Sequence, residues 1–222
     1  MYPYSDNVNE PNGVKSYSRY TAPVRYILKN AASQQGGCCI SKAETDFINM
    51  NRLLWMEHVN WTRMTIISIV FGLPDLQFVE ERLLRNATDL ANCLRPFYGD
   101  TIADRYAVLI KEHLLLAAEL VTAATKGDEK KAAEVERQWY RNADDIAEFL
   151  SSINPYLGKD EVREMFYMHL ALTKLEAVYM IQKNYKADIE VFDKIEAQAL
   201  EMSDMIACAI VKQFPGMFMP QC

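Results

Sequence analysis

The 222-residue chain contains few residues that interrupt regular structure, with only 8 glycines and 8 prolines. It also lacks the short signatures of several enzyme classes, since no GxSxG pattern, no HExxH pattern and no glycine-rich phosphate loop occurs. These absences argue against a serine hydrolase, a zinc metalloprotease and a nucleotide-dependent enzyme. The sequence does not settle whether the protein is an enzyme, but it favours a protein without enzymatic activity.

Long hydrophobic runs are absent as well. The longest apolar stretch, Met64 to Leu73, is interrupted by Thr65, Ser68 and Gly72, and it is far shorter than the roughly 20 residues that span a bilayer. The first residues lack the charged and apolar regions of a signal peptide. We therefore expect synthesis in the cytoplasm without a signal peptide, and no membrane span.

An excess of positive charge is also missing, because the net charge is −6 and the pI about 5.2. A nucleic-acid partner is not expected for such a chain, since those partners favour a positive surface. The charge is uneven. Residues 1–40 carry four basic and two acidic side chains, a net charge of +2, which leaves −8 for the remainder.

The five cysteines form no CxxC pair and no zinc-binding spacing. Cys93 and Cys208 fall within predicted helices and are expected to be small core residues. Cys38, Cys39 and Cys222 lie in the two terminal segments. There they either remain reduced thiols, as in a reducing compartment, or cross-link neighbouring chains.

Residues 1–40 differ in composition from the rest of the chain. They hold five of the twelve tyrosines and three of the eight prolines, together with many Ser and Asn residues. Such a segment has little capacity to form a core of its own. We therefore divide the chain into an extended N-terminal arm, residues 1–40, and a helical bundle with a short C-terminal tail, residues 41–222.

Apolar residues recur with helical spacing from residue 41 onward, and glycine and proline lie only at the joints. The expected fold class is all-α. The six expected helices span about 42–71, 75–95, 101–126, 129–152, 160–184 and 187–213. Short connections make neighbouring helices antiparallel, so the pattern predicts a six-helix bundle built from three consecutive helical hairpins.

An internal repeat supports this division into hairpins. The chain reads RNATDLANCLRPFYG from Arg85 and RNADDIAEFLSSINPYLG from Arg141. In the last hairpin this motif is altered, and its place is taken by Glu196, Glu201 and Asp204.

The three histidines follow the same repeat. His58 precedes Asn86 by 28 residues, and His113 precedes Asn142 by 29. His169 continues the series, at almost the same interval as separates the first two histidines. Each histidine falls on the apolar stripe of an odd-numbered predicted helix, so all three are expected to face the interior.

Four segments carry a resemblance to a known family: LLWMEHVNWTRMTIISIVFGLPD, LLRNATDLANCLRPFYGD, WYRNADDIAEFLSSINP and EAQALEMSDMIACAIVKQFP. Over about residues 50–215 the chain resembles an uncharacterised family of small bacterial helical-bundle proteins. Members of that family are labelled hypothetical, and some carry an acetylglutamate kinase label that looks like a misannotation. The resemblance implies the helical fold and no established activity, and the N-terminal arm lies outside it.

Three interpretations of the histidines remain open. In the first, His58 pairs with Asn86 and His113 with Asn142, because buried polar groups need partners. In the second, the three imidazoles converge to bind a transition metal. Imidazole is a ligand that suits Zn, Cu, Fe and Ni. Glu176, seven residues after His169 and on the same face, is the carboxylate that would complete that set. In the third, the interior contains a pocket for a small molecule.

Two functions follow from these observations. The first is a non-enzymatic, self-associating building block of a homomeric assembly, held together by the N-terminal arm and by Cys38, Cys39 and Cys222. A spore or surface assembly would suit such a protein. The alternative is a bundle that binds a metal or a small ligand through His58, His113 and His169. No cofactor beyond a possible transition metal is expected.

Overall fold

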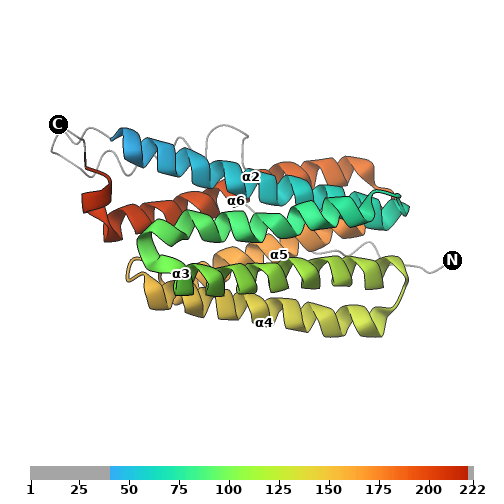
Figure 1. Cartoon of the computed structure of the whole chain (residues 1–222). Coiled ribbons are helices and arrows are strands. Elements are labelled where there is room, and N and C mark those ends of the chain that lie inside the picture. The colour runs from blue at the N-terminus through green and yellow to red at the C-terminus, as the bar shows by residue number, and fades with distance from the viewer. Residues whose placement is uncertain (1–40, 220–222) are drawn as a thin grey trace.

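The computed structural model describes residues 41–219, and within that range the protein is all-α, with no strand. Figure 1 shows the helices lying along one long axis. Their bounds are α2 Lys42–Phe71, α3 Leu76–Thr125, α4 Glu129–Ile153, α5 Lys159–Ile181, α6 Tyr185–Gln213 and a 3-10 turn η1 Pro215–Met217. The predicted arm, residues 1–40, lies outside the described residues, as do Cys38, Cys39 and Cys222.

The described part of the chain has five α-helices where six were predicted, because α3 joins two of the predicted helices across a bend at Gly99. Residues 75–95 and 101–126, expected to be separate, are continuous in α3, which contains Pro96 and one non-helical residue, Gly99. The residues on both sides of Gly99 are helical, so a single residue makes the bend. Figure 1 shows that the chain reverses direction there.

Gly99 is expected to be essential to this reversal. Its backbone angles, φ 77° and ψ 176°, fall in a region that only glycine enters readily. Gly99→Ala should lower the free energy of unfolding by about 1–3 kcal/mol, although an added Cβ would meet no atom within 4 Å. Chemical denaturation measures the change. Gly216→Ala is the matched control, because that site is equally open and has no positive φ, and we expect an effect below about 0.5 kcal/mol.

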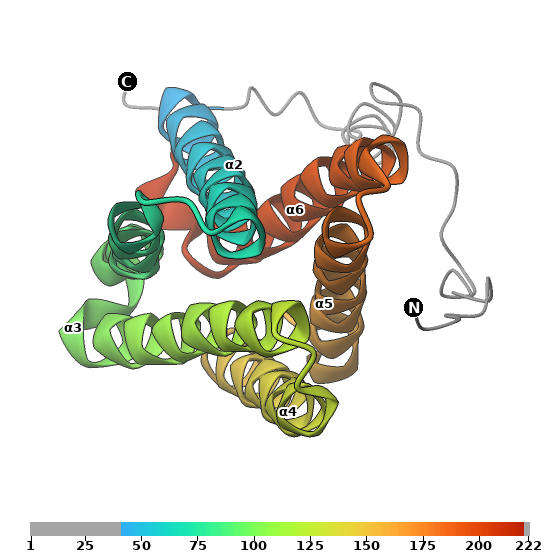
Figure 2. The ribbon, with the colours of Figure 1, turned by 90° about the vertical axis from the view of Figure 1, so that its right-hand side faces the viewer.

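The helices close into a bundle. α2 packs on α3, α3 on α4, α4 on α5 and α5 on α6, and α6 returns to α2. Figure 2, turned by 90°, shows α2, the two halves of α3, α4, α5 and α6 arranged around a common centre. The interior is filled by large side chains that include Trp139, Phe166, Leu109 and Ile146. Helices from distant parts of the sequence therefore contribute side chains to one shared core.

Two helices begin at a side-chain cap. Ser41 caps α2, since its side chain accepts a hydrogen bond from the Glu44 backbone N–H at 3.0 Å. Asp128 caps α4 in the same way through Lys131 N. Capping residues satisfy backbone N–H groups that have no partner inside the helix.

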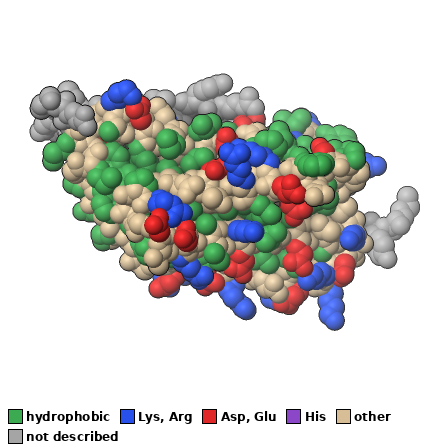
Figure 3. All heavy atoms as spheres, in the orientation of Figure 1, with side chains coloured by type: hydrophobic (Ala, Val, Ile, Leu, Met, Phe, Trp, Pro, Cys, Tyr) green, Lys and Arg blue, Asp and Glu red, His purple; other side chains and the backbone are tan. Residues whose placement is uncertain are grey.

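The surface carries both charged and apolar side chains. On the face drawn in Figure 3, hydrophobic side chains gather toward both ends and charged side chains lie between them, and no histidine is visible. No helix in residues 41–219 is long and apolar enough to cross a membrane.

Candidate functional site

Three histidines lie in the interior of the bundle, one each on α2, the second half of α3 and α5. His58, His113 and His169 are all 4% exposed or less. Each comes from the inward apolar stripe of its helix, as the sequence predicts. We call these three residues the histidine layer.

The first two histidines each meet a side-chain amide. His58 Nδ1 lies 3.2 Å from Asn86 Oδ1, and His113 Nδ1 lies 2.9 Å from Asn142 Oδ1. These are the pairs expected from the repeat. The two amides are themselves fully enclosed, so the pairs satisfy groups that water cannot reach.

His169 has an equivalent partner that the sequence analysis missed. Its Nδ1 lies 2.9 Å from Oε1 of Gln198 on α6. Gln198 follows His169 by 29 residues, the same interval as in the second pair, and carries the same amide group as Asn on a longer side chain. The altered third hairpin therefore retains the polar pair with glutamine in place of asparagine.

The three amides are held in the same way at their other end. In every case the amide nitrogen donates to the backbone carbonyl of the residue four positions before the histidine. The bonds are Asn86 Nδ2 to Leu54 O at 3.0 Å, Asn142 Nδ2 to Leu109 O at 3.1 Å and Gln198 Nε2 to Met165 O at 2.9 Å. A carbonyl can only accept, so each amide oxygen faces the imidazole. Each Nδ1 must therefore carry the hydrogen, and each Nε2 keeps its lone pair.

All three imidazoles are neutral at physiological pH. Burial lowers the pKa of His58 and His113 to about 3 and that of His169 to about 4. Repulsion between the rings lowers the pKa of His58 and His113 further, while the hydrogen bond to the amide opposes the shift in each pair. Removing a charged group from water disfavours its charged form, which explains the direction.

The rings of the histidine layer converge among aromatic side chains. The ring centroids of His58 and His169 are 5.7 Å apart, and Trp55 lies 5.6 Å from His58. His113 packs against Trp139 at 5.4 Å and Phe166 at 6.1 Å. Trp55 and Phe166 each precede a histidine by three residues, so each lies next to that histidine on the same helix face.

The metal hypothesis can be compared with this geometry. Within residues 41–219, no group of three or more His, Cys, Asp or Glu side chains is placed to hold a metal ion. The Nε2 atoms of His58, His113 and His169 have no hydrogen-bond partner among the described residues. A metal bound by the histidine layer stays a prediction.

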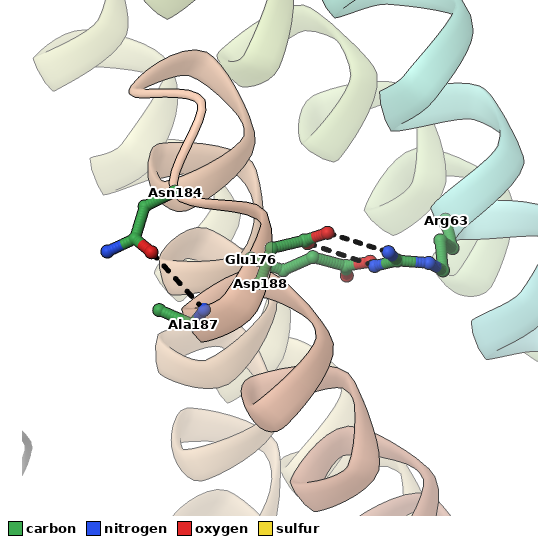
Figure 4. Close-up of polar contacts among 5 residues, drawn as sticks. All are labelled: Arg63, Glu176, Asn184, Ala187 and Asp188. Carbon is green, nitrogen blue, oxygen red and sulfur yellow. Dashed lines mark hydrogen bonds and ion pairs between the residues drawn. The ribbon is translucent and has the colours of Figure 1, made fainter.

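Glu176, the predicted fourth ligand, belongs to an ion cluster that joins α2, α5 and α6. Figure 4 shows Arg63 of α2 reaching both Glu176 and Asp188. Arg63 Nη1 lies 2.5 Å from Glu176 Oε1, and the two carboxylate oxygens of Asp188 accept from the same guanidinium at 3.0 and 2.7 Å. Arg63 also stacks on the Phe192 ring, 4.6 Å from its centroid. One cation thus serves two enclosed carboxylates.

This imbalance affects the proton affinity of Glu176. Burial raises the pKa of Glu176 to about 7, and the nearby Asp188 adds to the rise, while Arg63 opposes it. Glu176 is only 1% exposed, so its carboxylate has little access to water. The carboxyl group therefore titrates near neutral pH.

A cavity of about 600 Å³ lies between α2, α3, α4 and α5. Three of its lining residues, Thr62, Ala117 and Thr173, each follow a histidine of the layer by four positions. Residues four apart share a helix face, so the cavity starts one helical turn beyond the histidine layer. Its volume is within the range of small-molecule sites.

The lining of this cavity is mostly apolar. Six small side chains leave the space open: Ala117, Ala118, Ala124, Ala132, Ala133 and Ala177. Exposed residues such as Glu129 and Gln182 also line it, so the cavity opens to the surface near the connections that follow α3 and α5.

Two polar groups in the cavity wall have no partner among the described residues. They are Nε1 of Trp139 and Oγ1 of Thr173. An unpaired buried polar group costs about 1–3 kcal/mol. Both atoms have almost no accessible surface, so it is other atoms of Trp139 and Thr173 that line the cavity.

The two described cysteines do not contribute to this site. Burial raises the pKa of the Cys93 thiol to about 11, so Cys93 is not a reactive thiolate at neutral pH. Burial also raises the pKa of Cys208.

No protein-family model, curated protein or solved structure matches this chain.

Proposed function

We propose that this protein is a helical bundle that binds a small, mostly apolar molecule in the cavity between α2, α3, α4 and α5. The observation that carries the proposal is the cavity itself, about 600 Å³ and lined mainly by apolar side chains. Well-formed apolar pockets with a few polar groups are typical ligand sites.

The histidine layer lies one helical turn from this cavity and does not line it. Each of its neutral imidazoles is fixed by an amide, so the interior next to the cavity is rigid and uncharged. Rigid surroundings reduce the loss of conformational freedom when a ligand binds. In this proposal the histidines stiffen the bundle beside the site and do not act as acids or bases.

Ala117 offers a direct test, because it lines the cavity one turn beyond His113. Ala117→Leu places a larger side chain in the space. We expect binding of N-phenyl-naphthylamine, a neutral apolar probe whose fluorescence rises in apolar surroundings, to weaken at least about tenfold. The free energy of unfolding should rise by about 1 kcal/mol, because the added carbons fill empty volume.

The matched control is Ala43→Leu, which adds the same atoms to an exposed position of α2. It should leave probe binding unchanged. Unaltered binding to Ala117→Leu, in a variant that remains folded by circular dichroism, would show that the probe does not occupy this cavity.

The homomeric assembly predicted from the sequence depends on residues 1–40 and on Cys38, Cys39 and Cys222. All of these lie outside the described residues, and self-association stays a prediction.

A further inference from the structure

The shape of the cavity indicates what kind of molecule fits it, and this step rests on the proposed function. The lining runs along α3 from Leu114 to Ala124, along α4 from Glu129 to Trp139 and along α5 from Thr173 to Gln182. Each stretch is about ten residues long, so at a rise of about 1.5 Å per residue it extends about 15 Å along its helix. A volume of about 600 Å³ spread over that length has a mean cross-section of about 40 Å². The cavity is therefore about twice as long as it is wide.

The two ends of this cavity differ. The lining residues next to the histidine layer are at most 8% exposed, and they are Thr62, Leu83, Leu114, Trp139 and Thr173. At the opposite end the lining includes three exposed residues, Gly127, Glu129 and Gln182. Figure 1 shows that the connections after α3 and after α5 lie at the same end of the bundle. The cavity is therefore a channel that is closed beside the histidine layer and open between these two connections.

The hydroxyl and indole groups of the inner channel are not free to donate to a ligand. Thr62 Oγ1 and Thr65 Oγ1 donate to carbonyls of their own helix, at 2.8 and 2.9 Å. Trp139 Nε1 and Thr173 Oγ1 have almost no accessible surface. A polar head group inside the channel would lose its hydrogen bonds to water without replacement, which is unfavourable. The head group of a ligand therefore stays at the open end.

The charged residues of the lining lead to the same orientation. In the wall between α4 and α5, Lys174 Nζ lies 2.6 Å from Glu136 Oε1, so these two charges neutralise each other. The remaining charged residue, Glu129, is exposed at the mouth. The polar part of the lining that a head group can reach from water is thus at the mouth.

We propose that the channel binds an unbranched aliphatic chain end-on, with its terminal methyl group beside the histidine layer and its polar head group in water at the mouth. The alanines of α3, α4 and α5 leave room for the chain along its whole length. A chain of about ten to twelve carbons spans the channel. The site then selects chains by length, because carbons beyond that number remain in water.

A series of 1-alkanols from 1-hexanol to 1-tetradecanol tests this length limit. Their head group is neutral, so the charge of Glu129 at the mouth does not affect the comparison. Each alcohol is measured by displacement of N-phenyl-naphthylamine from the full chain at pH 8. We expect the affinity to rise about three- to fourfold with each added methylene, because each is transferred from water to an apolar wall. The rise should level off at about ten to twelve carbons.

Two leucine substitutions at different depths test the end-on orientation. Ala117 and Ala124 both line the channel and lie seven residues apart on the same face of α3, so Ala124 is about 10 Å nearer the mouth. Ala117→Leu should leave 1-hexanol binding unchanged and make the affinity level off about two to four carbons earlier. Ala124→Leu, the matched control, should weaken every alcohol at least about fivefold, because every chain passes it.

The outcomes separate this inference from the proposed function. An affinity that does not level off in the natural chain, or an equal loss for 1-hexanol and 1-dodecanol in Ala117→Leu, overturns the end-on chain and leaves the proposed function standing. The series on the natural chain tests the length limit without any substitution. If neither N-phenyl-naphthylamine nor any of the alcohols binds the folded protein, the proposed function fails as well.

Discussion

Lowering the pH from 7 to 4.5 is expected to reduce the free energy of unfolding by about 5 kcal/mol, mainly through the histidine layer. The folded pKa values of His58 and His113 are about 3 and that of His169 about 4, against an ordinary value of 6.5. Because folding lowers the pKa of each histidine, the contribution of these neutral imidazoles to stability is complete above pH 6.5. That contribution is lost as the pH falls toward the pKa of the folded state. The three histidines together account for a loss of about 7–8 kcal/mol over this interval.

Glu176 acts in the opposite direction. Its folded pKa is raised from 4.5 to about 7, so its contribution to stability is complete below pH 4.5 and is lost as the pH rises through 7. Acidification over the same interval therefore raises the free energy of unfolding by about 2–3 kcal/mol through Glu176. The net loss of about 5 kcal/mol is comparable with the whole stability of many domains, and acid unfolding should be complete well above the pKa of the folded histidines.

Chemical denaturation at a series of pH values measures this loss. The double variant His113→Leu/Asn142→Leu removes one complete pair without stranding either partner. Its loss of stability between pH 7 and 4.5 should be smaller by about 2–3 kcal/mol, and unfolding near pH 5 should take up about one proton fewer. A double variant with the same acid sensitivity as the natural protein would show that the buried imidazoles do not govern acid unfolding.

The sequence predicted the histidine layer well because its information is local and periodic. The repeat places His58 and His113 on inward stripes and positions Asn86 and Asn142 to meet them, and the structure brings these groups together. The partner of His169, Gln198, was missed because the third hairpin lacks the repeated motif that begins at Arg85 and Arg141 in the first two. The spacing of 29 residues from His169 was the signal that would have identified it.

The predicted helix count differs from the observed one for a different reason. Gly99 was correctly taken as the joint, but one residue with a positive φ reverses the chain, so the helical residues continue on both sides of it. Sequence patterns place such a glycine without revealing how many residues around it leave the helix.

The cavity could not be predicted, because it depends on how α2, α3, α4 and α5 pack. Six alanines on α3, α4 and α5 leave space only because no larger side chain from a neighbouring helix enters it. The Arg63 cluster is likewise a product of tertiary packing, since Arg63 lies 113 residues from Glu176 and 125 from Asp188 in the chain. Glu176 was predicted to share a site with His169, and the structure places its carboxylate against Arg63.

Arg63→Met should lower the free energy of unfolding by about 3–5 kcal/mol at pH 8, because it leaves two enclosed carboxylates without their cation. Arg63 bridges Glu176 and Asp188, which are at most 4% exposed at their side chains. Arg85→Met is the control for loss of an exposed ion pair. Arg85 meets Asp89 with 70% of its own side chain exposed, and we expect an effect of about 0.5 kcal/mol or less.

The pH dependence of this variant separates lost charge pairing from lost packing. At pH 5.5 the penalty of Arg63→Met should be smaller by about 1–2 kcal/mol, because a protonated Glu176 no longer needs the cation. Adding Glu176→Gln and Asp188→Asn to Arg63→Met should restore most of the stability at pH 8, since no uncompensated charge then remains. If instead the penalty is equal at both pH values and the added substitutions restore nothing, Arg63 acts through its stacking on Phe192. The ion cluster would then not be what joins α2 to α5 and α6.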